Sequence, residues 1–336
     1  MSTTQKLLPI IAAGGQGLRM YPLSFGDQPK QFIRLGNKGT LLEITLKRVS
    51  AIMEQCKSRN YHVLEPLLIM HHTHKLPSEL SHHESNVVYE LYGNDTAVAV
   101  ANAIVEIKKR YNDESITMLF LPADHYIYNE DAFVKDITDG LDHITHDNIV
   151  LYGIHPTSPD TKYGYIIPSD NGIIFKEKPN IEQAQGFIAQ NALWNSGIFA
   201  ARSDRIYQCL TTYKYDIMDW VNNPREGKAP SFDIAILQEH ANIYAHKCFD
   251  WKWADIGTWK SFIEVPEIID EMAQSRVITA DCTHINVLNR NSSNIVIIGC
   301  HDLLVVTNDN HILIMPTTGD YSNQLKAIAT ITSMNI

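Results

Sequence analysis

A glycine-rich turn followed by two cations is the first pattern with chemical meaning in this chain of 336 residues. Gly14, Gly15 and Gly17 stand just before Arg19, and Lys30 comes soon after. Glycines let backbone N–H groups approach a polyphosphate closely, and the two cations can neutralise its charge. The turn lacks the Gly-Lys-Ser/Thr of a Walker A loop and the third glycine that opens a helix in dinucleotide-binding folds. It therefore predicts a phosphate site of another kind.

Two aspartates could supply a metal site to the same phosphates. Asp124 and Asp255 each follow an apolar run and lie in a turn rich in Pro, Gly or Trp. Two carboxylates brought together from strand ends can hold a Mg²⁺ ion on nucleotide phosphates, because hard cations prefer oxygen ligands. A helix cap or a salt bridge is the alternative for either aspartate.

The elements that must position these residues follow an α/β pattern. Strand-like runs at 7–13, 66–70 and 116–121 alternate with helix-like segments, which predicts a Rossmann-like mixed sheet. Thr40 and Glu43 form a capping box for one helix, and Asp95 or Thr96 caps a helix that runs to about residue 110. The run at 7–13 is interpreted as a buried strand rather than a signal segment.

The second half of the chain has a different pattern of predicted elements. Residues 148–178 are broken by prolines and glycines, which predicts a hairpin-rich insertion over the sheet. A helical stretch is expected from 259 to about 274, and short β runs follow at 286–288, 294–298, 303–307 and 311–315. We therefore expect a large α/β domain over 1–275 and a small C-terminal β domain over 276–336, for which a β-helix-like form is open. No strict internal repeat is visible.

Composition narrows the function classes. The formal net charge is −10 and no lysine or arginine block occurs, so nucleic acid is not an expected partner. No apolar stretch approaches the length that crosses a bilayer, so no membrane partner is expected. The five cysteines are odd in number and scattered without CxxC spacing, so neither a disulfide framework nor a cysteine zinc site is expected, which favours a cytoplasmic location. The histidines between residues 71 and 83 are interpreted as part of a polar surface loop rather than a zinc site.

Ordered motifs give the chain a family resemblance. The opening Ile10–Arg19, with Pro22-Leu23-Ser24 and Pro29-Lys30-Gln31-Phe32, resembles the mannose-1-phosphate guanylyltransferases, a branch of the sugar-phosphate nucleotidyltransferases. Further matching motifs are Leu121–His125, Lys162–Ile166, Phe175–Pro179, Trp194–Phe199, Ser231–Asp233, Trp253–Trp259 and Gly299–Val306. Many bacterial members carry an additional cupin-type isomerase domain, and the chain ends before one, so no phosphomannose isomerase activity is expected.

The resemblance implies an enzyme that makes GDP-mannose and pyrophosphate from GTP and mannose 1-phosphate with Mg²⁺ as cofactor. Arg19, Lys30 and Lys178 would be catalytic, and Asp124 and Asp255 would hold the metal. The implied nucleotide-binding residues are Ala13, Gly14, Gly15, Gly17, Glu90, Thr96, Pro122 and Asp124. The implied sugar-phosphate-binding residues are Gly164, Glu177, Lys178 and Asn195. A homodimer is kept open as the oligomeric state.

Two departures from the family pattern keep alternatives open. The segment Glu90–Ala97 replaces a proline, an arginine and an asparagine that are usual beside the nucleobase, and Phe25 stands where an arginine is usual. One alternative is therefore the same chemistry on another hexose or heptose 1-phosphate or with another nucleoside triphosphate. An alternative of a different class is a non-catalytic regulatory subunit that binds sugar nucleotides.

Overall fold

The computed structural model describes residues 4–112, 114–212, 216–239, 242–291 and 293–334. Contacts divide the chain into two compact units. The first comprises residues 1–14, 46–123 and 127–253, and the second comprises 15–45, 124–126 and 254–336. Each unit is described by itself. The domain boundary predicted at residue 275 stays a prediction, because a contact unit need not fold independently.

The first unit is built on one mixed sheet of ten strands, as the alternating apolar runs predicted. The central strand order is β11-β7-β10-β5-β1-β3-β4, with β2 beside β1 and the hairpin β8–β9 beside β10. Strands β1, β3, β4 and β5 are mutually parallel, whereas β10 is antiparallel to β5 and β7. The strands are β1 Gln5–Ala13, β2 Tyr61–Val63, β3 Leu67–His71, β4 Val87–Glu90, β5 Thr117–Pro122, β7 Ile149–Ile154, β8 Tyr165–Ser169, β9 Gly172–Lys176, β10 Leu193–Arg202 and β11 Ile243–Cys248.

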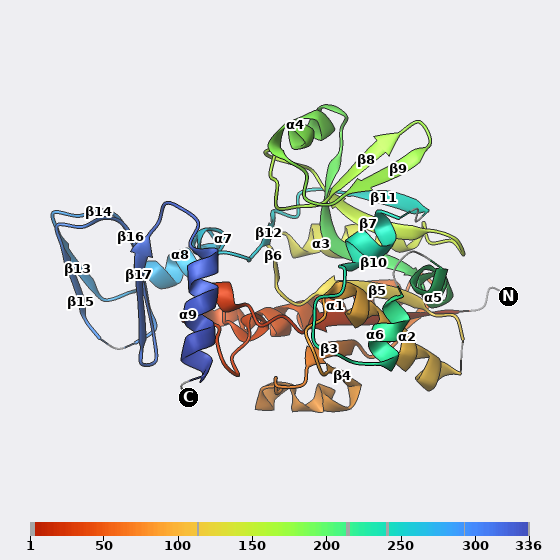
Figure 1. Ribbon diagram of the computed structural model, residues 1–336, viewed down its shortest axis with the longest axis horizontal. Helices are drawn as coiled ribbons and strands as arrows, with labels where there is room; N and C mark the ends of the chain where they lie inside the picture. The colour runs from red at the N-terminus through yellow and green to blue at the C-terminus, as the bar shows by residue number, and fades with distance from the viewer. Residues whose placement is uncertain (1–3, 113, 213–215, 240–241, 292, 335–336) are drawn as a thin grey trace. The chain divides into compact units, whose positions relative to one another are not determined.

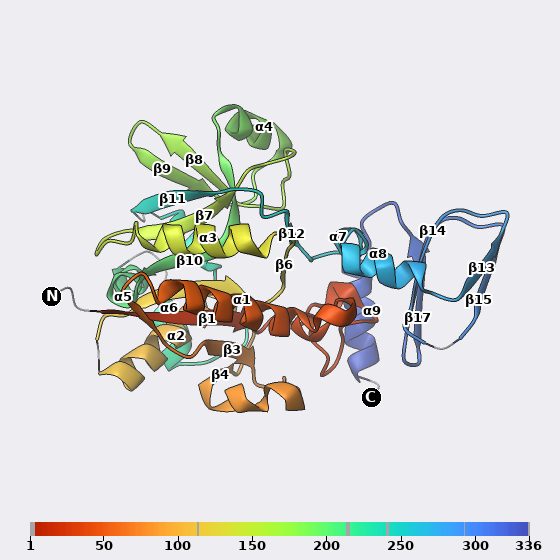
Figure 2. The ribbon, with the colours of Figure 1, turned by 180° about the vertical axis from the view of Figure 1, so that it is seen from behind.

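Helices cover both faces of this sheet, as Figures 1 and 2 show from opposite sides. One face carries α2 and α5, and the other carries α3. The helices with most of their residues in this unit are α1 Leu41–Cys56, α2 Thr96–Tyr111, α3 Glu130–Leu141, α4 Ile181–Ala189, α5 Ser203–Thr212 and α6 Ile217–Asn222, with a 3₁₀ segment at Ser78–Asn86 and a π-helical turn at Asp233–Leu237. The predicted capping box at the start of α1 is present, since the amide of Thr40 donates to Glu43 at 2.6 Å. Asp95 caps α2 through the amide of Thr96.

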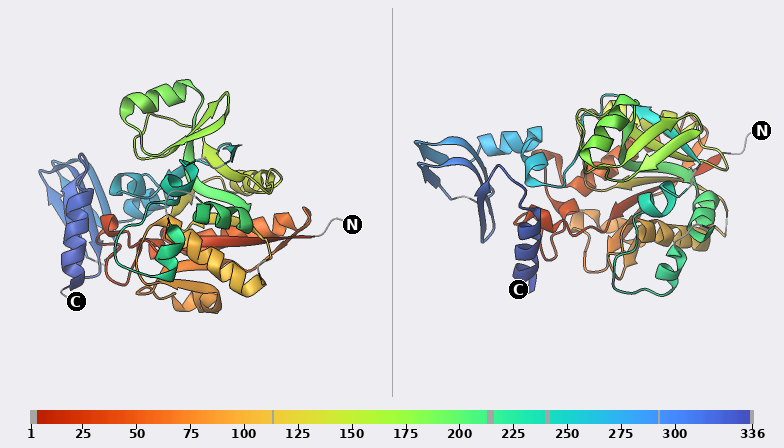
Figure 3. Two further views of the ribbon diagram at one scale, coloured as in Figure 1. Left: turned by 45° about the vertical axis from the view of Figure 1, so that its right-hand side comes forward. Right: turned by 45° about the horizontal axis from the view of Figure 1, so that its top comes forward.

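The segment 148–178 contains the predicted hairpin, β8–β9, which projects from the sheet together with α4 (Figure 3, left). Its first strand, however, is not part of an insertion. β7 lies inside the large sheet between β10 and β11, because five of its six residues are buried and need cover on both faces.

The second unit combines the glycine-rich segment with the end of the chain. It has short 3₁₀ turns at Leu18–Met20, Lys30–Phe32 and Gly36–Lys38. Met20 of the first turn, with Ile33 and Leu35, shares a core with the helices α7 Trp259–Ile263, α8 Pro266–Ala273 and α9 Ser322–Met334. Strands β6 His125–Ile127 and β12 Trp253–Asp255 form a two-stranded sheet. The single helix predicted over 259–274 is two helices, because Pro266 lacks the N–H that would continue α7.

The C-terminal strands form stacked coils, which agrees with the predicted β domain (Figure 3, right). They are β13 Val277–Ala280, β14 Thr283–Asn289, β15 Ile295–Ile298, β16 His301–Asn308 and β17 His311–Pro316. Val277 pairs in parallel with Ile295, and Thr283 pairs in parallel with His301, so both pairings share one offset. The second coil therefore lies on the first as in a β-helix, and β17 closes it as an antiparallel strand. We call these five strands the β module.

No helix among the described residues is long and apolar enough to cross a bilayer.

Candidate active site

In the second unit the structure brings Lys30, Asp124 and Asp255 together. The Lys30 Nζ lies 2.7 Å from Asp124 Oδ2 and 3.5 Å from Asp255 Oδ1. Burial alone would lower the pKa of Lys30, but the two carboxylates outweigh it and raise the pKa above its ordinary value. Burial would likewise raise the pKa of Asp124, and Lys30 and His125 reverse the direction. Lys30 and Asp124 are thus held in their charged forms near neutral pH.

The glycine turn fixes the position of Lys30. Gly17 has a φ of +68°, and a Cβ built there would lie 2.2 Å from the Cβ of Lys30, so only glycine fits beneath the lysine. The Ser24 hydroxyl donates to the carbonyl of Gly17 and closes the turn. Lys30 itself begins a 3₁₀ turn and is 7% exposed. The fixed turn and the burial of Lys30 therefore direct its side chain toward the two aspartates.

Arg19 and Gly15 lie on the exposed part of the same segment. The Arg19 guanidinium forms no ion pair with any residue that the structure describes, so its donors are free for an anion. A free guanidinium beside exposed glycine amides is a chemistry that suits phosphate oxygens.

The donor set of Asp124 and Asp255 fits a divalent cation. A positive charge, the Lys30 ammonium, already lies against both carboxylates. The described residues contain no group of three or more metal-ligating side chains, so a cation held by Asp124 and Asp255 would take its other ligands from phosphate and water. Mg²⁺ typically binds in this way, through one or two carboxylates and substrate phosphates.

In the first unit, the ends of β1, β3 and β4 gather a second set of groups. Glu90 ends β4 opposite His71 of β3, and its Oε2 lies 3.3 Å from the place a Cβ of Gly14 would occupy. Asn102 donates to Glu90 Oε1 at 3.0 Å. Burial raises the pKa of Glu90 to about 7, although the Asn102 bond lowers it. Glu90 is therefore a buried acceptor that can take or release a proton near neutral pH.

A third group lies beside the β8–β9 hairpin, also in the first unit. Asn195 donates to Asp233 Oδ1 at 2.7 Å, and Lys178 forms an ion pair with Glu177. Burial raises the pKa of Asp233 to about 7, and the charge of Glu177 adds to the rise. A Cβ on Gly164 would lie 2.7 Å from Glu177 Oε2, so the glycine leaves room for that carboxylate. We call Glu177, Lys178, Asn195 and Asp233 the hairpin cluster.

Side chains of the altered segment 90–97 form hydrogen bonds to other parts of the chain. The Asn94 side chain donates to the carbonyls of Arg225 and Gly227 at 3.0 and 2.9 Å. The Thr96 hydroxyl accepts from the amide of Phe232 at 2.9 Å. Asn94 therefore ties the loop to the 225–227 segment and is not free to contact a base.

Phe25, the second departure, is part of an aromatic group in the second unit. Its ring lies edge-on to Tyr21 and to His311 of β17, with centroid separations of 5.5 and 4.6 Å. The residue that replaces the usual arginine thus joins the glycine-rich segment to the β module.

The expected site residues fall into both units. Gly15, Gly17, Arg19, Lys30, Asp124 and Asp255 belong to the second, and Ala13, Gly14, Glu90, Thr96, Pro122, Gly164, Glu177, Lys178 and Asn195 belong to the first. The structure brings members together within each unit as described above, and their individual roles stay predictions.

Sequence reasoning missed two residues. Asp233 appeared in a matching motif without a role, although it contacts Asn195 directly. His74 was placed in a polar surface loop, but it is 1% exposed and bonded to the backbone of Ala13, and burial lowers its pKa to about 4. A neutral histidine therefore supports the end of β1 before the glycine turn.

Comparison with known proteins agrees with this geometry. A model of the nucleotidyl transferase family matches residues 8–272. A mannose-1-phosphate guanylyltransferase of Salmonella montevideo is 30% identical over 93% of this chain and 71% of its own length, and one of Escherichia coli is 28% identical over 92% and 72%. A crystal structure described as a mannose-1-phosphate geranyltransferase from Thermus thermophilus superposes with a TM-score of 0.73 at 22% identity, covering 98% of this chain and 99% of that one, which shows the fold.

The family resemblance predicted from the motifs is therefore confirmed. Enzymes of this family typically use a divalent metal, which agrees with the donor set at Asp124 and Asp255. The chain is a nucleotidyltransferase, and it belongs with the mannose-1-phosphate guanylyltransferases.

Proposed function

We propose that this enzyme transfers a guanylyl group from GTP to mannose 1-phosphate. A phosphate oxygen of the sugar phosphate attacks the α-phosphorus of GTP, the bond from that phosphorus to the β-phosphate oxygen breaks, and GDP-mannose and pyrophosphate form. The observation that carries the proposal is the buried Lys30 between Asp124 and Asp255 at the end of a glycine turn. Such transfers depend on positioning and on charge neutralisation rather than on covalent steps at the protein.

The charge of each site residue indicates which part of the substrates it would bind. The free Arg19 guanidinium would receive the departing pyrophosphate, and Lys30 would hold the reacting phosphate of the nucleotide. Lys178 would bind the phosphate of the sugar, and Glu177 would accept from sugar hydroxyls. The metal is proposed to be Mg²⁺, held by Asp124 and Asp255, and when bound it supplies further neutralisation of phosphate charge.

Glu90 is proposed to select the base. Guanine presents two donors, N1–H and N2–H₂, which an ionised carboxylate accepts, whereas adenine presents an acceptor at N1. An acceptor facing a buried carboxylate leaves both groups unpaired, and this costs binding free energy.

A second candidate is the same chemistry with another sugar 1-phosphate or another nucleotide. It is favoured by Asn94, which stands where the family usually has an arginine. Its side-chain amide donates to the carbonyls of Arg225 and Gly227 and so does not contact the base. The non-catalytic alternative is disfavoured, because a binding subunit has little need for both Asp124 and Asp255 beside a lysine.

A pyrophosphate-release assay separates these candidates. Wild-type enzyme with Mg²⁺ receives one nucleoside triphosphate at a time against mannose, glucose and heptose 1-phosphates. The proposal expects the largest kcat/KM for GTP with mannose 1-phosphate. A larger value for another pair would establish the second candidate instead. A homodimer is also proposed, and light scattering of the purified enzyme tests it.

A further inference from the structure

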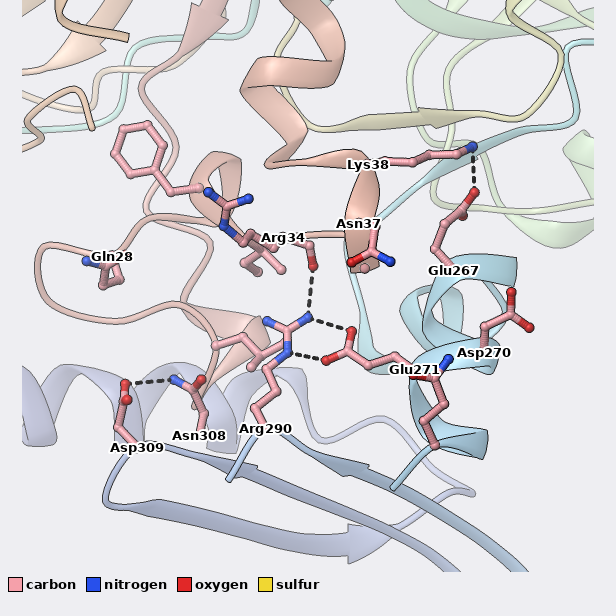
Figure 4. Close-up of a pocket in the computed structure, with 15 residues that line it drawn as sticks. Gln28, Arg34, Asn37, Lys38, Glu267, Asp270, Glu271, Arg290, Asn308 and Asp309 are labelled. Atoms are coloured by element: carbon pink, nitrogen blue, oxygen red, sulfur yellow. Dashed lines mark hydrogen bonds and ion pairs between the residues drawn. The ribbon is translucent and has the colours of Figure 1, made fainter. Parts of the chain in front are cut away.

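The back of the segment that carries Lys30 borders a cavity of about 980 Å³ inside the second unit (Figure 4). Residues 28, 32–34 and 36–38 form one wall, and α8 with Arg290, Asn308 and Asp309 forms the other. Figure 4 shows Lys38 paired with Glu267 across the cavity, Arg290 paired with Glu271, and Arg290 bonded across it to the carbonyl of Arg34. The cavity is therefore spanned by bonds that join the two walls.

Arg290 makes the densest set of these bonds. It follows β14 directly, and its Nε and Nη2 donate to the two carboxylate oxygens of Glu271 on α8 at 2.8 and 3.1 Å. The same Nη2 donates to the carbonyl of Arg34 at 2.8 Å. A bidentate guanidinium–carboxylate pair is rigid, so the Arg34 carbonyl is held by a donor that is itself fixed.

The Arg34 carbonyl is connected to Lys30 through a short, bonded stretch of backbone. Lys30 begins a 3₁₀ turn in which the amide of Ile33 donates to the Lys30 carbonyl at 3.0 Å. The amide of Leu41 at the start of α1 donates to the carbonyl of Ile33, and the amide of Leu35 donates to the carbonyl of Gly39. A bond at Arg34 therefore restrains the turn that aims the Lys30 side chain.

Other side chains of the C-terminal part hold the same segment at its remaining bends. Asn308 donates to the carbonyl of Pro22 at 3.1 Å, and His311 Nδ1 lies 2.9 Å from the hydroxyl of Tyr21. On α9, the hydroxyl of Ser333 accepts from the amide of Gly26 at 3.1 Å. These contacts reach the segment before Lys30, whereas Arg290 reaches it after Lys30.

We propose that Arg290 is a positioning residue for Lys30, and that the β module acts in catalysis by clamping the Lys30 segment from behind. The role in turnover rests on the proposed function, whereas the clamp itself does not. Arg290 touches neither of the aspartates nor Lys30, so its effect on the reaction passes through the Arg34 carbonyl.

Hydrogen exchange tests the clamp without any assumption about the substrate. In Arg290→Met the amides of residues 28–38 should exchange about tenfold faster, because the lost charge-assisted bonds are those that restrain them. Asp302→Asn is the matched control, since Asp302 lies in the same β module and, among the residues that the structure describes, its side chain pairs with the exposed His284 alone. Unchanged exchange at 28–38, or an equal rise throughout the chain, would overturn the clamp.

Kinetics test the link to Lys30. Arg290→Met should lower kcat about tenfold while KM for mannose 1-phosphate stays within twofold, because a displaced lysine weakens the transition state rather than sugar binding. Millimolar guanidinium ion should restore part of the rate, and Glu271→Gln should lose less, since its Arg290 keeps the bond to Arg34. A wild type that fails to turn over GTP would refute the proposed function only. A clamp verified by exchange together with unchanged kcat in Arg290→Met would overturn the positioning role.

Discussion

Two clusters in the molecule each contain one lysine among carboxylates: Lys30 with Asp124 and Asp255, and the hairpin cluster. The pKa values of their carboxylates are shifted in opposite directions. Lys30 contacts both Asp124 and Asp255, and its own pKa is raised while that of Asp124 is lowered. In the hairpin cluster, Lys178 pairs with Glu177, and Asp233 bonds to the neutral amide of Asn195. Burial then raises the pKa of Asp233 to about 7.

The difference shows that a direct cation, rather than the number of nearby charges, decides which carboxylate stays ionised. Lys30 and Asp124 should keep their charges across the neutral range, as a metal and triphosphate site requires. The hairpin cluster should change charge near pH 7, where the sugar phosphate is proposed to bind.

The largest effect is expected from removing a carboxylate of the Lys30 cluster. Asp124→Asn or Asp255→Asn should lower kcat/KM by about 10³-fold or more, because several kcal/mol of charge stabilisation in the transition state is lost. Steady-state pyrophosphate release at saturating Mg²⁺ measures it. Glu54→Gln, in an exposed pair with Lys57, is the control and should be unaffected. Near-normal rates in either aspartate variant would contradict the metal assignment.

Lys178 should matter for one substrate only. Lys178→Met should weaken mannose 1-phosphate binding by roughly 1.5 to 3 kcal/mol, the range for a charge-assisted hydrogen bond, and change GTP binding little. Calorimetric titration with each substrate separates the two. An equal loss for both substrates would show that Lys178 supports the fold of the hairpin cluster rather than the sugar phosphate.

Glu90 should control the choice of base in a pH-dependent way. With a pKa raised to about 7, its carboxylate is mostly ionised above that pH and mostly protonated below it. The protonated form can donate to adenine N1, so the ratio of kcat/KM for GTP to that for ATP should fall as the pH drops from 8 to 6. Glu90→Gln should lower this ratio about tenfold at pH 8 and remove its pH dependence. A ratio that follows pH identically in variant and wild type would exclude Glu90.

The smallest effect is expected from Asp233. Because its raised pKa leaves it neutral below about pH 7, ionisation above that pH adds negative charge near Lys178 and should weaken sugar-phosphate binding severalfold. Asp233→Asn should keep the bond to Asn195 in modified form and remove this rise in KM between pH 6.5 and 8. Comparison of the two KM profiles cancels the titration of the substrate itself. Parallel profiles would show that Asp233 does not titrate there.

The sequence predicted the fold where local signals were strong. The Thr40–Glu43 capping box and the buried run that became β5 both encode their elements within a few residues. The β-helix coils were harder to predict, because only Val287 and Val305 are an identical pair among the aligned residues of β14 and β16, and the other pairs show no sequence repeat. The break at Pro266 was available in the sequence and was missed.

For the candidate site as well, local patterns predicted some residues and missed others. The sequence grouped Lys30 with Arg19 through the glycine turn and Asp124 with Asp255 through the strand-like runs that precede them. The bond between Asn195 and Asp233 joins residues 38 positions apart, and the bond from Arg290 to Arg34 joins residues 256 apart. No local pattern encodes such pairs, since the packing of whole elements creates them.

The most direct test of the proposed function follows the phosphorus atoms. Wild-type enzyme, GTP, mannose 1-phosphate and Mg²⁺ are combined and the products are observed by ³¹P NMR. We expect equal amounts of pyrophosphate and of a diphosphate ester with two coupled phosphorus signals, together with loss of both substrates. Release of orthophosphate and GDP without that ester, or no reaction with GTP while another nucleoside triphosphate reacts, would contradict it.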